Sequence, residues 1–92
     1  MKTYKIWYSA AYIKRAKRFN KRHPELRKQY EKTLQILEMN PAHPSLRLHR
    51  LKGKLENLHS VSINRQYRIL LHFIIRDDVI IPVAVGSHDE VY

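Results

Sequence analysis

The sequence feature that most constrains this fold is a change of hydrophobic period along the chain. Between residues 9 and 39, apolar side chains recur at every third or fourth position, which is the spacing of one face of an α-helix. Between residues 58 and 75, apolar and polar residues alternate, as in a strand with one buried face. Residues 3–8 alternate in the same way, and residues 79–85 form a continuous apolar run. These periods predict an α+β fold with the order β-α-α-β-β-β.

Two helices are predicted in the first half of the chain. Ser9 is suited to cap a helix that runs to about Asn20, because its hydroxyl can accept a hydrogen bond from a free backbone N–H. Pro24, at a favoured first helical position, starts a second helix that ends at about Met39. Two helices joined so tightly should form an antiparallel hairpin over one face of a sheet. The residues expected to be buried are Tyr12, Ile13, Ala16 and Phe19, then Leu26, Tyr30, Thr33, Leu34 and Leu37.

Three further strands are predicted after the helices, at residues 58–64, 67–75 and 79–85. Pro82 indicates that the last of them lies at an edge or carries a bulge, and Gly86 is expected to end it. With the strand at residues 3–8, they form a four-stranded, mainly antiparallel sheet. A single helical hairpin covers only one face, so the other face should stay open. The buried positions expected on these strands are Val61, Ile63, Ile69, Leu71, Phe73 and Ile75.

Length and composition limit the classes of protein to consider. A chain of 92 residues fits a single domain spanning residues 1–92. The sequence contains no cysteine, which excludes disulfides, thiolate metal ligands and a catalytic thiol. No stretch approaches the roughly 18 apolar residues of a membrane span, and the N-terminus lacks the apolar block of a signal peptide. A cytoplasmic location is therefore expected.

The net charge of +10 is unevenly distributed. Residues 1–57 contain fifteen Lys or Arg against four acids, or +11, whereas residues 58–92 contain three against four, or −1. A basic half on a small domain favours polyanions, through phosphate neutralisation and counterion release. The plainer interpretation is a solvated helix face. Nucleic acid is the first partner expected, and an acidic protein the second.

The open sheet face is the predicted site of chemistry. Cleavage of RNA without a metal requires a base for the 2′-hydroxyl, cations for the charge on phosphorus and an acid for the leaving oxygen. His49 and His88 are the best histidine candidates, since each lies near a glycine-containing loop at a predicted strand end. His72 lies mid-strand among apolar residues, as a packed histidine does. No histidine pair has the spacing of a helical zinc motif, so no metal and no cofactor are expected.

Three short motifs lie in order along this pattern: LKGKL at residues 51–55, NRQYRI at 64–69 and GSHDEVY at 86–92. Together with the order of elements, they resemble the RelE/ParE toxin superfamily, and RelE- and YafQ-like toxins of type II toxin–antitoxin systems most closely. The resemblance covers nearly the whole chain. It implies an endoribonuclease of the mRNA interferase kind, which cleaves ribosome-bound mRNA and inhibits translation. It also implies a cognate acidic antitoxin, a hetero-oligomeric toxin–antitoxin complex, and the ribosome and mRNA as further partners.

The resemblance assigns roles residue by residue. His88 matches the tail histidine, a candidate general acid or base, and Tyr92 matches the terminal aromatic that orients the mRNA. His49 matches a second functional histidine. Lys52 and Lys54 match basic residues that hold phosphate. The full set of catalytic candidates is His88, His49, Arg65, Arg68 and Tyr92, and that of RNA- or phosphate-binding candidates is Arg50, Lys52, Lys54, Ser62 and Tyr67.

One position departs from the family pattern. Many relatives carry an arginine or histidine where this chain has Ser62, and a serine cannot neutralise a phosphate. Arg65 or Arg68 would then have to supply that charge. Two other functions are compatible with the sequence. One is a ParE-like poison of DNA gyrase or another topoisomerase, which would not need the tail histidine. The other is a catalytically silent module that binds RNA or a partner, and Ser62 favours this alternative.

Overall fold

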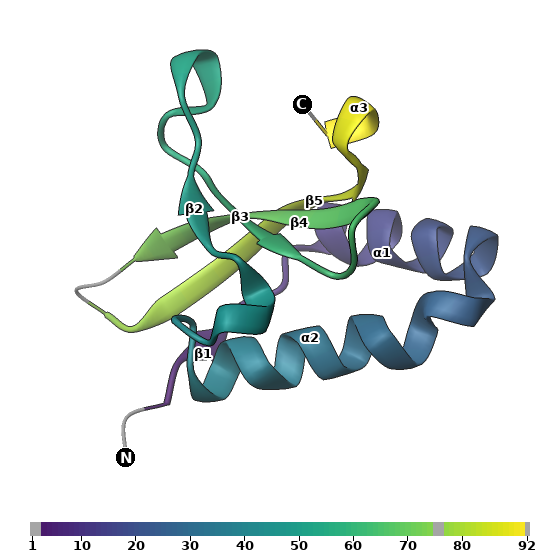
Figure 1. The fold of residues 1–92 in the computed structure, drawn as a ribbon, viewed down its shortest axis with the longest axis horizontal. Helices are drawn as coiled ribbons and strands as arrows, with labels where there is room; N and C mark the ends of the chain where they lie inside the picture. Colours follow the sequence, from purple (N-terminus) through teal and green to yellow (C-terminus); the bar gives the residue numbers. More distant parts are fainter. Residues whose placement is uncertain (1–2, 75–76, 92) are drawn as a thin grey trace.

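The computed structural model describes residues 3–74 and 77–91 (Figure 1). Its elements follow the predicted order, with one extra strand and a short C-terminal helix. Three single-turn 3₁₀ helices lie at Pro24–Leu26, Pro44–Leu46 and Gly53–Leu55. The strands and α-helices are β1 (Lys5–Ile6), α1 (Ala10–Arg22), α2 (Arg27–Met39), β2 (His49–Arg50), β3 (His59–Ser62), β4 (Tyr67–Ile74), β5 (Val79–Ser87) and α3 (His88–Val91).

The sheet has five strands in the order β1-β5-β4-β3-β2. Strand β1 pairs with β5 in parallel, and every other pairing is antiparallel. The prediction of four strands missed β2, in which His49 lies opposite Ser60 and Arg50 opposite His59. A two-residue strand is too short to produce a recognisable alternation of polar and apolar residues. The predicted α+β architecture is otherwise confirmed.

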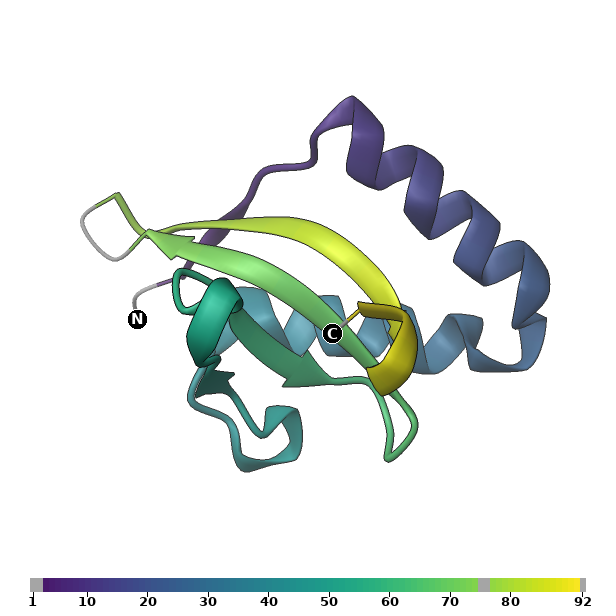
Figure 2. The same ribbon diagram turned by 90° about the horizontal axis from the view of Figure 1, so that it is seen from above.

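Helix α2 covers one face of the sheet, and α1 lies along the β5 side (Figures 1 and 2). Their buried side chains join β3, β4 and β5 in one apolar cluster on that face. The hydroxyl groups of Tyr12 in α1 and Tyr30 in α2 form a buried hydrogen bond of 2.8 Å. We call the face of the sheet that these helices cover the helix side. Its fully or nearly fully buried residues are Tyr12, Phe19, Tyr30, Leu37, Leu46, Val61, Ile63, Ile69, Leu71 and Ile80.

The helix boundaries are close to those expected. Ser9 caps α1 as predicted, with its Oγ accepting a hydrogen bond of 3.1 Å from the backbone N–H of Tyr12. The helix continues to Arg22, two residues beyond the expected end. Ile13 was expected to be buried but is 43% exposed. Because α1 packs along the side of the sheet, its buried stripe is narrow, and Ile13 lies about 100° around the helix from Tyr12.

The β4–β5 hairpin contains the bulge that Pro82 predicted. Leu70 lies opposite Ala84 and Leu71 opposite Pro82, so Val83 is the extra residue. Strand β5 as a whole lies between β1 and β4. At Pro82, however, β5 has no paired neighbour on the β1 side, because β1 pairs only as far as Ile80, so the proline also occupies a locally free edge. The expected position Ile75 lies outside the described residues.

The expectation that Gly86 ends the last strand is wrong. Strand β5 continues through Gly86 to Ser87, which lies opposite Tyr67. The chain then turns directly into α3. The tail therefore begins directly after a paired residue of the sheet, since Ser87 still pairs with Tyr67.

Candidate functional site

The face opposite α2, which we call the open side, carries two projections, and its strand residues are buried or half-buried (Figure 1). One projection is the segment 51–58 between β2 and β3, and the other is α3. Figure 2 shows them at different positions above the sheet, with β3 and β4 between them. Successive side chains of a strand point to opposite faces, so the residues between those of the helix side lie on this face. They are Ser60 and Ser62 in β3, Arg68 and Leu70 in β4, and Ala84 and Gly86 in β5.

His88 begins α3, and its side chain is 66% exposed. Its Nδ1 lies 3.8 Å from Oδ1 of Asp89. The imidazole is therefore accessible to a ligand on the open side, as the sequence analysis required, and is not packed into the apolar interior.

A reciprocal pair of hydrogen bonds holds α3. The backbone N–H of Ser87 donates to Oε1 of Glu90 at 3.0 Å, and the N–H of Glu90 donates to Oγ of Ser87 at 3.3 Å. This is a capping box. The bonds from Ser87 lower the pKa of the Glu90 carboxyl, with smaller contributions from the positive charges of Arg22 and His23. The Ser-x-x-Glu spacing was visible in the sequence and was missed.

His49 lies on the edge strand β2 with an exposed side chain. Its Nδ1 is 3.1 Å from the carbonyl oxygen of Arg47. A carbonyl oxygen can only accept, so Nδ1 carries the proton of this hydrogen bond. The Nε2 atom of the neutral ring then has a free lone pair, which is the form that a general base requires.

The segment 51–58 is a basic loop with a fixed base. Arg50 donates from Nε to the carbonyl oxygen of Glu56 at 3.0 Å, and the N–H of Leu51 donates to the carbonyl oxygen of Leu58 at 3.0 Å. Gly53 adopts φ +69°, a left-handed conformation that favours glycine. Lys52 and Lys54 are exposed near the tip. Their flexible side chains can reach phosphates at different positions on a ligand with little change in the loop backbone.

Arg68 lies between the two histidines. The strand order separates β2 from β5 by three strand spacings, which is roughly 14 Å at about 4.8 Å each. Arg68 is on β4, inside this interval, and its Nη1 donates to Oγ of Ser60 at 3.3 Å. Along the strands, His49 is level with Leu70, whereas Arg68 is level with Gly86, two residues before His88. Arg68 therefore lies between the two histidines both across and along the strands.

Other predicted site residues lie elsewhere. The ring of Tyr67 is on the helix side, with its centroid 5.4 Å from that of Phe19 and 4.6 Å from that of His23. Ser62 is only 8% exposed, and its hydroxyl donates to the carbonyl oxygen of Asn64 at 2.6 Å. Arg65 is exposed in the turn between β3 and β4. Tyr92 lies outside the described residues.

The sequence analysis did not single out His59, which pairs with Arg50 across β2 and β3. Its ring centroid is 5.7 Å from that of Phe73. Burial lowers the pKa of His59, and the neighbouring Arg50 guanidinium and His49 ring lower it further. The neutral ring is thus favoured.

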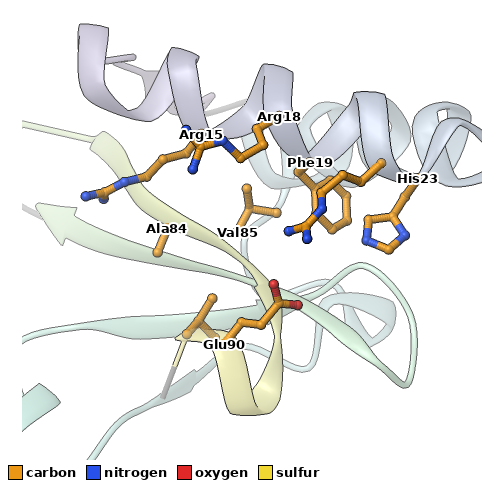
Figure 3. Close-up of a pocket in the computed structure, with 9 residues that line it drawn as sticks. Arg15, Arg18, Phe19, His23, Ala84, Val85 and Glu90 are labelled. Carbon is orange, nitrogen blue, oxygen red and sulfur yellow. The ribbon is translucent and has the colours of Figure 1, made fainter.

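An arginine-lined groove of about 440 Å³ separates α1 from α3, with β5 between them (Figure 3). Arg15, Arg18 and Arg22 line its α1 wall, and Glu90 lines the α3 wall. Arg15 donates to the carbonyl oxygen of the bulge residue Val83 at 2.6 Å. These arginines were not predicted as site residues, because their proximity to the tail depends on tertiary packing.

Two absences apply to the described part of the chain. Within residues 3–74 and 77–91, no three His, Cys, Asp or Glu side chains come together as a metal site would require. Within the same residues, no helix has the length and hydrophobicity needed to cross a bilayer.

Solved structures of several toxins have a similar fold. YafQ from Escherichia coli BL21(DE3) superposes with a TM-score of 0.79 at 16% identity, over 97% of this chain and 98% of that one. A metal-bound toxin from Helicobacter pylori gives 0.76 at 23% identity, over 97% and 99% of the two chains. The YoeB–YefM complex from Staphylococcus aureus gives 0.70 at 21%, over 92% and 97%. No curated protein matches the sequence.

At the sequence level, residues 4–88 match the family described as RelE-like toxin of type II toxin–antitoxin system HigB. The match includes both helices, all five strands and His88. This chain therefore belongs to the RelE-like toxins of type II toxin–antitoxin systems.

Proposed function

We propose that this toxin is an endoribonuclease that cleaves mRNA on the ribosome and thereby inhibits translation. The observation that carries the proposal is the placement of Arg68 between two exposed histidines, His49 and His88, on one open face. RNA crossing this face would bring a phosphate to the arginine with an imidazole on either side. The reaction is attack of a ribose 2′-oxygen on the adjacent phosphorus, with loss of the 5′-oxygen of the next nucleotide.

Each candidate group has a role in that reaction. His49 accepts the 2′-hydroxyl proton at Nε2, because its Nδ1–H is bonded to Arg47. His88 donates a proton to the departing 5′-oxygen. Arg68 has guanidinium N–H groups beyond the one bonded to Ser60, and these stabilise the charge that develops on the phosphate.

The remaining predicted residues act in binding. Lys52, Lys54 and Arg65 are exposed cations that contact neighbouring phosphates. Arg50 supports the loop through its bond to Glu56. Tyr92 stacks on a base. Tyr67 and Ser62 act indirectly, Tyr67 through the packing of β4 against α1 and Ser62 through the β3–β4 turn.

The second part of the proposal is an acidic antitoxin that forms a hetero-oligomeric complex with this chain. A net charge of +10 calls for an acidic partner, and the charge would favour rapid association. Two of the similar solved structures are complexes, DinJ–YafQ from E. coli and YoeB–YefM from S. aureus. The ribosome is itself a polyanion, so it would compete with the antitoxin for the same basic surface.

Mapping of mRNA 5′ ends after brief induction tests the proposed reaction. The unaltered chain should generate new 5′ ends within translated regions, and His88→Ala should not, while it still folds by circular dichroism. His72→Ala is the matched control, because His72, which was expected to be packed, is instead an exposed histidine further along β4. Identical 5′ ends with and without induction of the unaltered toxin would contradict RNA cleavage.

A catalytically silent module that binds RNA or a partner is the second candidate function. The observation that favours it is Ser62, which replaces the usual cation and whose hydroxyl donates to the carbonyl oxygen of Asn64. Induction would then leave mRNA 5′ ends unaltered, and no DNA-damage response would follow. A DNA-damage response with unaltered mRNA would instead indicate a topoisomerase poison of the same fold.

A further inference from the structure

We propose that Gly86, Ser87 and Glu90 form a clasp that holds α3 against the sheet and fixes the position of His88, with Glu90 as a positioning residue. We call these three residues the tail clasp. The inference rests on the proposed function in one respect, namely that His88 acts on RNA. The attachment of α3 itself does not depend on any activity.

The first observation is the length of α3, which has only four residues. Isolated helices shorter than about 12 residues are marginal in water, and chain ends fray unless they are tied down. His88 is the first residue of this helix, so its imidazole is positioned only as well as α3 is. Some feature of the fold must therefore supply the order that the helix lacks.

The second observation is the capping box. Ser87 is the last paired residue of β5, so its backbone is held by the sheet. Glu90 bonds to both groups, at 3.0 Å and 3.3 Å. The two bonds close a ring around His88 and Asp89, the residues between Ser87 and Glu90. The carboxylate thus joins the short helix to the rigid strand.

The third observation is the close approach of α3 to Gly86. A Cβ atom at this position would lie 3.2 Å from Cβ of Glu90 and 3.3 Å from Cγ1 of Val91. Both contacts are tighter than most carbon–carbon contacts in proteins. A side chain at this position would push α3 away by a few tenths of an ångström, so the glycine favours the close approach of the helix to β5.

The fourth observation is the charge across the arginine-lined groove. Figure 3 shows the Glu90 carboxylate directed from α3 towards α1. The positive charges of Arg22 and His23 favour its ionised form. Helix α1 thereby supports the clasp from the far side of the groove, and the ionised carboxylate is the stronger acceptor for the Ser87 N–H.

Comparison of Glu90→Ala with Glu90→Gln tests the clasp. Glutamine keeps an acceptor oxygen at the capping position, whereas alanine removes it. Glu31→Ala is the matched control, because Glu31 is an exposed carboxylate on α2 that is paired with Arg27. The readouts are ¹⁵N heteronuclear NOE values at residues 88–91, and kcat and KM for cleavage of mRNA on purified ribosomes.

Glu90→Ala should lower the NOE values at residues 88–91 and reduce kcat by roughly 10- to 100-fold, because small misplacements of a reacting group are costly. KM and the thermal midpoint should be nearly unchanged. Glu90→Gln should restore most of both the NOE values and kcat, and Glu31→Ala should match the unaltered chain. Gly86→Ala should resemble Glu90→Ala.

Two results would overturn the proposal. One is a tail in Glu90→Ala that is as ordered as in the unaltered chain. The other is a disordered tail with unchanged kcat, which would remove the positioning role. If the unaltered toxin cleaves no RNA, the proposed function fails, and the NOE values then decide separately whether the clasp exists.

Discussion

The two faces of the sheet are built differently. The helix side is a continuous apolar cluster in which Tyr12 and Tyr30 also share a buried hydrogen bond. The open side carries two short projections, the loop 51–58 and α3, each held by a few hydrogen bonds. Stability therefore comes mainly from one face, and the exposed groups proposed for chemistry are on the other. Changes on the helix side should affect folding, and changes on the open side should affect activity.

The largest expected effect on stability is at two adjacent leucines of β4, which lie on opposite faces of the sheet. Leu71 has no exposed surface on the helix side, whereas Leu70 is 2% exposed on the open side and lies outside the apolar cluster. Leu71→Ala should cost about 4–5 kcal/mol and Leu70→Ala about 2–3 kcal/mol, since both remove buried methyl groups but the second site relaxes more easily. Chemical denaturation measures both values. Equal losses of stability in the two variants would show that the two faces contribute equally to folding.

The next effect concerns the buried hydroxyl pair. Tyr12→Phe should cost about 1–3 kcal/mol, because the hydroxyl of Tyr30 loses its partner while buried. Adding Tyr30→Phe should recover part of that loss, since neither buried ring then carries an unsatisfied polar group. A double-mutant cycle by denaturation gives the coupling. Strictly additive costs would show that the hydrogen bond does not link α1 to α2.

The same tyrosines predict a dependence of stability on alkaline pH. Burial raises the pKa of Tyr12 and of Tyr30, and it raises the pKa of Tyr8 to about 12. The unfolded chain loses these protons near pH 10, so stability should fall as the pH rises above that value. Denaturation midpoints at pH 9 and pH 11 measure the fall, which should be smaller in the double phenylalanine variant. A flat profile would contradict the burial of these hydroxyls.

The smallest expected effect on stability is at the tip of the basic loop. Gly53→Ala should cost about 1–2 kcal/mol, because alanine is strained at φ +69°. Gly53→Asn should cost less, since asparagine tolerates this conformation. Denaturation measures the cost, and RNA affinity reports whether the lysines keep their positions. An alanine variant as stable as the unaltered chain would show that the loop relaxes freely.

The helix side was largely predictable from sequence, because each prediction there rests on a period repeated over many residues. Ser9 and the buried positions Val61, Ile63, Ile69 and Leu71 were identified correctly for that reason. The exposure of Ile13 was not predicted, since it depends on the position of α1 along the β5 side of the sheet.

The open side was less predictable. Strand β2 is too short for a period, and the ring of Tyr67 faces the helices although a family motif placed it in the site. Gly86 was interpreted as a strand end because its role, the space needed by Glu90 and Val91, exists only after the tail folds back. The capping box was the one local signal that could have revealed α3.

Single-turnover cleavage of ribosome-bound mRNA by His49→Ala, His88→Ala and the double variant tests the two-histidine face most directly. Each single change should slow cleavage by about 100-fold or more, because each removes a general acid or base, and all three proteins should remain folded. The double variant should be no faster than the slower single variant. Folded single variants that cleave at the rate of the unaltered toxin would contradict the account.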